Sequence, residues 1–165
     1  MTSTCGKTMR TIDEIVVRAP VRACYDAGAD VERWPERLAH YRWVRFLRKD
    51  GFGIGRVEMA ARRPFGPLSY PVWWVSEMTV DETRPAIIYR HVEGVTTGMD
   101  VEWAFTDLGN GATGVRIVHD WAEGPEWPLP APVLRAVADR VIGPVFIHHV
   151  AARTLRGIRR YLEGA

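Results

Sequence analysis

Residues 98–122 read GMDVEWAFTDLGNGATGVRIVHDWA, two runs of alternating apolar and polar residues on either side of Asn110-Gly111. Asn and Gly both tolerate positive φ, which the tightest β-hairpin turns require. The stretch therefore predicts two antiparallel strands, 98–108 and 112–122. Successive side chains of a strand point to opposite faces, so each run has one apolar face that we expect to cover a core.

Comparable runs precede this hairpin and predict a larger sheet. β-Branched and aromatic residues separated by short turn signals predict strands over 10–18, 41–49, 53–63, 68–80 and 86–93. From residue 41 onward the connections are short, which favours antiparallel pairing because parallel neighbours need a crossover of a dozen or more residues.

Helices are expected after the first strand and after the last one. Two short helices are predicted at 20–28 and 31–38, and a long one at 133–162 with a bend at Gly143-Pro144. The simplest arrangement that buries both apolar surfaces is an α+β fold. In it, a curved seven-stranded antiparallel sheet wraps around the long C-terminal helix.

Composition restricts the class of protein. The chain has 165 residues, 47% of them hydrophobic and 25% charged, which fits one globular domain at 10–165 after a flexible segment at 1–9. The net charge of +2 is small and interspersed, which argues against nucleic acid as a partner. No apolar run is long enough for a transmembrane helix. Two cysteines without a close His–Cys pair predict a cytoplasmic protein with neither a metal nor another cofactor.

The opening segment IDEIVVRAPVRACYDAGADVERWPERL (12–38) resembles the START-like helix-grip superfamily, in particular its polyketide cyclase/dehydrase and lipid-transport branch. The matching features are Ala19-Pro20 after a strand, Tyr25 in a helix, and the run DVERWP at 30–35. Segments 91–105 and 145–162 are similar to the same branch, which includes aromatase/cyclase-like and coenzyme Q-binding proteins. The resemblance implies a cavity between the concave sheet and the long helix that holds a sterol, lipid, quinone or aromatic polyketide.

Strand alternation indicates which side chains would line such a cavity. Positions two apart share a face of a strand, and positions three or four apart share a face of a helix. Strands 68–80 and 86–93 carry large side chains on both faces, so alternation alone leaves their inner faces ambiguous. For strand 86–93, the face that carries Ile87 is preferred to the face that carries Ile88. The predicted ligand-binding residues are Trp74, Tyr89, His91, Met99, Trp103, Phe105, Ile117, Trp121, Val141, Val145 and His148.

Two residues are candidates for chemistry. His119, alone or with His148, could transfer a proton near neutral pH, and Arg63 could hold an enolate or carboxylate. The alternatives are a hydrogen-bonded core histidine and a charge at the rim of the cavity. The main functional hypothesis is therefore binding of a hydrophobic small molecule: a polyketide-derived aromatic, a quinone or a lipid. The alternative is an aromatase/cyclase or dehydratase acting on a poly-β-keto substrate.

A further feature is the basic end of the long helix. The arginines are interpreted mainly as complementing the negative end of the helix dipole, with a weak contact to a membrane surface or an acidic partner as the alternative. Monomer and homodimer both remain open. The arginines in question are Arg153, Arg156, Arg159 and Arg160.

Overall fold

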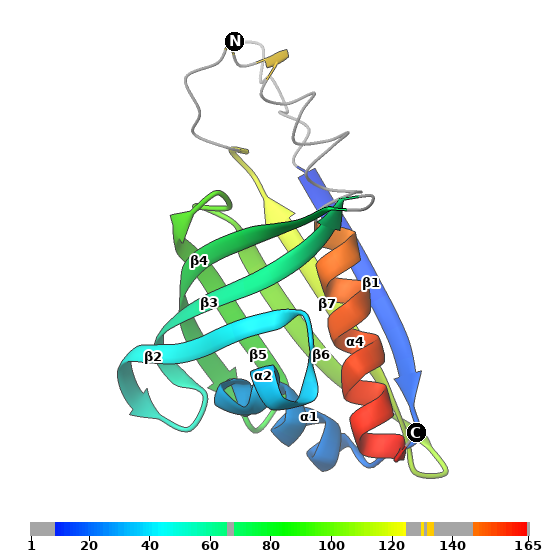
Figure 1. The fold of residues 1–165 in the computed structure, drawn as a ribbon. Coiled ribbons are helices and arrows are strands. Elements are labelled where there is room, and N and C mark those ends of the chain that lie inside the picture. The colour runs from blue at the N-terminus through cyan, green and yellow to red at the C-terminus, as the bar shows by residue number, and fades with distance from the viewer. Residues whose placement is uncertain (1–8, 66–67, 125–129, 131, 134–146, 165) are drawn as a thin grey trace, which may run out of the picture.

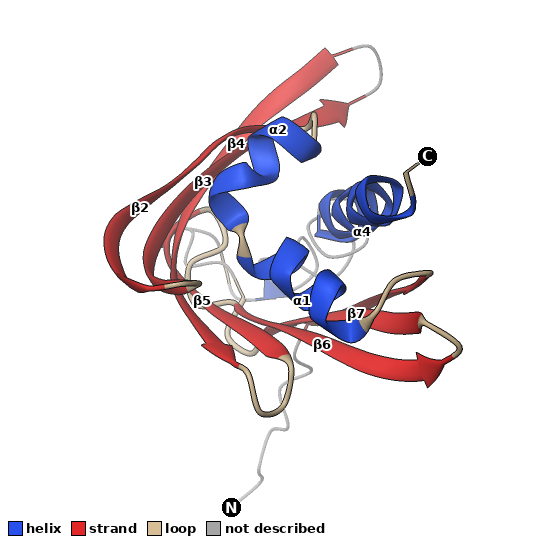
Figure 2. Ribbon diagram, turned by 90° about the horizontal axis from the view of Figure 1, so that it is seen from below, coloured by secondary structure: helices blue, strands red, loops and turns tan. Residues whose placement is uncertain are grey.

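The computed structural model describes residues 9–65, 68–124, 130, 132–133 and 147–164. Within them, seven antiparallel strands form one curved sheet around a helix (Figures 1 and 2). The strands are β1 (Met9–Val17), β2 (Tyr41–Gly51), β3 (Ile54–Phe65), β4 (Leu68–Asp81), β5 (Ala86–Gly94), β6 (Asp100–Gly109) and β7 (Ala112–Trp121). The α+β helix-grip fold predicted from the sequence is confirmed.

The sheet order is β1-β7-β6-β5-β4-β3-β2, so consecutive strands from β2 to β7 pair with each other and β1 returns to pair with β7. The predicted start of β6 at residue 98 is two residues early. A turn occupies that position, with the Thr97 amide donating to the Gly94 carbonyl oxygen (3.2 Å) and Gly98 at φ +87°. This turn lies at one end of the concave face, where it closes over the core.

The helices cover the concave face. α1 (Val21–Ala29), the 3₁₀ turn η1 (Val31–Arg33) and α2 (Trp34–Arg37) follow β1, and α4 (His148–Glu163) ends the described chain. The single short helix predicted over 31–38 is therefore split into two pieces. The long helix is confirmed over 148–162, whereas its predicted first half and the bend at Gly143-Pro144 lie outside the described residues. None of the helices described is long and apolar enough to cross a membrane.

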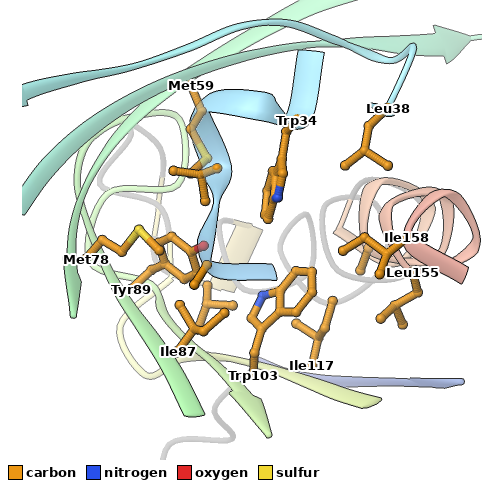
Figure 3. Close-up of a cluster of buried hydrophobic side chains, with 14 of the residues drawn as sticks. Trp34, Leu38, Met59, Met78, Ile87, Tyr89, Trp103, Ile117, Leu155 and Ile158 are labelled. Atoms are coloured by element: carbon orange, nitrogen blue, oxygen red, sulfur yellow. The ribbon is translucent and has the colours of Figure 1, made fainter. Parts of the chain in front are cut away.

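Apolar side chains from the sheet, α2 and α4 converge on one core, as Figure 3 shows. Trp34 of α2 points into it and packs against Tyr41 and Trp103, with ring centroids 5.0 and 5.6 Å apart. Gly157 allows α4 to approach the end of α2 closely, because a Cβ there would lie 2.3 Å from Leu38 Cδ2. A larger residue at position 157 would therefore force the buried Leu38 side chain to move.

Candidate functional site

A cavity of about 70 Å³ lies between the concave face of the sheet, α2 and α4. Its walls are mainly apolar and aromatic, and a few polar side chains reach it. Seven of the predicted ligand-binding or catalytic residues line it: Trp74, Tyr89, His91, Met99, Trp103, Ile117 and His119. The sequence prediction of unfilled, apolar space at this position is confirmed.

Two histidines contribute neutral polar groups to the cavity. The ring of His91 stacks on Trp74 at 6.0 Å and 15°, and its Nδ1 lies 2.6 Å from Thr96 Oγ1. Nδ1 of His119 lies 3.4 Å from Thr11 Oγ1. Burial lowers the pKa of both histidines to about 3, with a smaller contribution from His119 to the shift of His91. Both imidazoles are therefore uncharged near neutral pH and act there as hydrogen-bonding groups.

Tyr89 supplies a buried hydroxyl. It stands in one cross-strand row with Val101 and His119, is only 4% exposed, and points into the core from β5 (Figure 3). Its hydroxyl has no hydrogen-bond partner among the described residues. Burial raises its pKa well above 10, so the phenol keeps its proton and can donate it to an acceptor in the cavity.

A hydrogen-bonded pair forms the wall beside α4. Thr154 Oγ1 donates to the Val150 carbonyl oxygen (2.9 Å) and lies 3.0 Å from His40 Nε2. Because the hydroxyl proton is already committed, His40 Nε2 must be the donor in the second contact, which leaves a lone pair on His40 Nδ1. Thr154 faces the cavity, and His40 lies on the other side of the wall, away from the cavity lining.

Two predicted lining residues lie in the core beyond the cavity. Phe105 packs edge-on against Tyr25 of α1, with ring centroids 5.8 Å apart. Trp121 is 1% exposed, and its Nε1 donates to the Thr97 carbonyl oxygen at 3.0 Å. Both residues face inward as predicted, but α1 covers one and the turn before β6 covers the other. Alternation identifies the face of a strand and not the position of a cavity along it.

The inward position predicted for His148 is wrong. Its side chain is 60% exposed, and its Nδ1 pairs with Asp13 Oδ1 of β1. The buried face of α4 and its N-cap includes Ile147, Ala151, Thr154, Leu155 and Ile158, and His148 lies outside it. One residue rotates the direction of a side chain by about 100° around a helix, which places His148 beside β1 and outside the cavity.

The remaining predicted residues are not located by their side chains. Arg63 lies in β3 opposite Tyr70, but its side chain is outside the described part of the chain, as are Val141 and Val145 entirely.

The structure also adds lining residues that the predicted set lacked. Three carried a signal in the sequence: Trp34 belongs to the DVERWP run, Met59 shares a face with Val57 in β3, and Val101 alternates with Met99 and Trp103. Thr96 is in a turn and carried no signal. The added residues are Trp34, Tyr41, Met59, Thr96, Val101, Ile147, Val150, Ala151 and Thr154.

Comparison with known proteins agrees with this geometry. Residues 17–145 match the family model described as polyketide cyclase / dehydrase and lipid transport. The chain belongs to this family. A Streptomyces cyaneus protein named "Putative polyketide cyclase" is 30% identical over 122 residues, which cover 72% of this chain and 76% of that protein.

Solved structures of other proteins share the fold. The Zhui aromatase/cyclase from Streptomyces sp. R1128 is similar with a TM-score of 0.66 and 20% identity, over 93% of this chain and 96% of that one. A START superfamily protein from Mycobacterium smegmatis is similar with a TM-score of 0.68 and 13% identity, over 94% and 97% of the two chains. The resemblance inferred from the opening segment is confirmed.

Proposed function

We propose that this family member binds a flat hydrophobic small molecule with a carbonyl or phenol oxygen, such as a polyketide-derived aromatic, in the cavity. The observation that carries the proposal is the Tyr89 hydroxyl, which faces an apolar cavity and has no partner in the described part of the chain. A buried hydroxyl without a partner is unfavourable, and an acceptor on a ligand would satisfy it. The Trp74–His91 stack provides a flat surface beside it for an aromatic ring.

The size of the cavity sets a condition on binding. Its volume of about 70 Å³ is smaller than the ~150 Å³ cavity that accepts benzene in a protein core. A bicyclic ligand therefore requires the walls to move. Met59 and Met99 line the cavity, and unbranched methionine side chains change rotamer more readily than branched or aromatic ones. We infer that these two side chains yield to the ligand.

The electrostatics favour binding over proton transfer. A general base works best with a pKa near the working pH, and both cavity histidines have a pKa of about 3. In this state they are weak bases and better suited to orient a ligand oxygen. Quinones and lipids with one polar end satisfy the same requirements, so the proposal extends to them.

The test is a binding titration with matched ligands. Wild-type protein, Tyr89→Phe and Tyr161→Phe are titrated with 1,4-naphthoquinone and with naphthalene, and tryptophan fluorescence is followed. Loss of one neutral hydrogen bond should weaken naphthoquinone binding by about 3- to 10-fold in Tyr89→Phe and leave naphthalene binding unchanged. Tyr161 is 49% exposed, so Tyr161→Phe should behave as wild type. Absence of saturable binding of either compound would refute the proposal.

Cyclisation or dehydration of a poly-β-keto chain is the second candidate, favoured by the protonated Tyr89 phenol, which could stabilise a developing enolate. Under this hypothesis His119→Ala or Arg63→Ala abolishes turnover of a synthetic poly-β-ketone and preserves naphthoquinone binding. Equal loss of turnover, binding and folded structure would assign these residues a structural role.

Location and assembly belong to the same proposal. Cys24 is buried and free, in keeping with a reducing cytoplasm. Cell fractionation tests the location, and sedimentation velocity distinguishes a monomer from a homodimer.

A further inference from the structure

A second concave site lies outside the cavity, between α4 and the segment that follows α2. It is a groove of about 230 Å³, hereafter the arginine groove, with His40 and Gly157 in its walls. Four arginines also line it: Arg153, Arg156, Arg159 and Arg160. Within the described residues none of these guanidinium groups has a carboxylate partner. Arginines of the sheet such as Arg48, Arg56 and Arg90 are paired.

The helix dipole accounts for only one of these charges. Its effect is confined to the last turn, and Arg160 is the basic residue of that turn. Arg153 and Arg156 lie further back along α4, where the dipole offers little. Like charges three or four residues apart on a helix repel one another. An anion in the groove would relieve this repulsion.

His40 adds an acceptor to a groove otherwise rich in donors. Its Nε2–H donates to Thr154, so Nδ1 carries a lone pair, and Nδ1 has no partner within the described chain. His40 is neutral near pH 7, because burial and then the charges of Arg153 and Arg160 lower its pKa to about 4. The groove therefore presents guanidinium donors around one neutral acceptor.

We propose that the arginine groove binds a phosphate group. Guanidinium forks match the spacing of phosphate oxygens, and a monoprotonated phosphate supplies both the negative charge for the arginines and an O–H for His40 Nδ1. A discrete group can enter a concave groove, whereas a flat bilayer surface cannot. The site is distinct from the apolar cavity and shares with it the His40–Thr154 wall, so it does not depend on the function proposed above.

The experiment is an amide NMR titration with sodium phosphate, compared with sodium chloride at equal ionic strength. Phosphate should cause saturable shifts confined to residues 38–40 and 153–160, and it should raise the pKa of His40. The double variant Arg153→Gln/Arg156→Gln should bind phosphate at least about 10-fold more weakly. Arg10→Gln is the control for removing an arginine elsewhere on the surface, because exposed Arg10 lies at the start of β1, far from the C-terminal end of α4 (Figure 1).

Two further arms identify the source of the phosphate. Phenyl phosphate stands for a phosphorylated small molecule. Vesicles of phosphatidylcholine with 30% phosphatidic acid present the group on a lipid. Saturable binding of inorganic phosphate together with either phenyl phosphate or the vesicles supports the site. Whichever of these two probes binds identifies the source of the phosphate group. Identical shifts with chloride, unchanged affinity in the double variant, or vesicle binding without any phosphate binding would each overturn the proposal.

Discussion

Replacing His119 by Gln should flatten the pH dependence of stability by a calculable amount. The folded protein holds this imidazole neutral with a pKa of about 3, whereas in the unfolded chain its pKa is the ordinary 6.5. Between these values the unfolded chain binds more protons than the folded one, so stability is complete above about pH 6.5 and is lost as the pH falls. Integrated from pH 7 to pH 5, this difference in proton binding at one histidine lowers the free energy of unfolding of the wild type by about 2 kcal/mol.

The assay is urea unfolding followed by tryptophan fluorescence at pH 7 and pH 5. Apart from a smaller change at His91, whose pKa His119 also lowers, the other titrating groups contribute equally to both proteins. The difference between the two losses therefore reports mainly on His119. His119→Gln should lose about 2 kcal/mol less than wild type between these pH values. Ile117→Val, in the same wall of the cavity, should cost about 1 kcal/mol at both pH values and keep the wild-type dependence. An equal loss in His119→Gln and wild type would mean that the folded protein protonates this imidazole readily, and the reasoning would fail.

Three other substitutions test single features of the structure. Gly55→Ala should cost at least about 2 kcal/mol in thermal unfolding, since Gly55 has φ +144° and an added Cβ would lie 2.1 Å from a carbonyl oxygen of β2. His148→Ala removes the partner of Asp13, a residue only 4% exposed, and should cost about 1–3 kcal/mol in urea unfolding. Adding Asp13→Asn should restore part of the lost stability, because it removes the buried charge that His148 compensates. If stability is not restored, an uncompensated charge on Asp13 is not the cause of the loss. Trp73→Phe should raise the pKa of Glu58 measured by carboxyl NMR, because the hydrogen bond from Trp73 Nε1–H (2.8 Å) is the main cause of its lowered pKa. An unchanged pKa would assign the shift to Arg45 and Trp43.

The fold could be predicted almost completely from local signals. The Asn110-Gly111 turn occurs where positive φ is needed, and Asn110 has φ +54°. Alternation in β5 correctly placed Tyr89 and His91 on the inner face and Ile88 on the outer one, where it is 38% exposed. These features follow from the two-residue period of a strand and from the conformations that single residues allow.

The candidate site was predicted only in part. The inner face of a strand continues past the cavity at both ends, so Phe105 and Trp121 met the same criterion as Trp103 and yet pack against α1 and a turn. The prediction turned His148 of α4 toward the cavity, whereas its side chain is exposed. The spacing of apolar residues alone admits neighbouring helix faces of similar hydrophobicity.

The sequence by itself determined the strands, the turns and the face that each side chain takes, because these depend on backbone geometry within a few residues. Only the tertiary structure decided which polar groups acquire partners. Among the described residues the Tyr89 hydroxyl has no partner, Asp13 meets His148 across β1 and α4, and four arginines gather beside His40. These relations join residues far apart in the chain, and they arise from how the curved sheet and α4 pack, which no local period encodes.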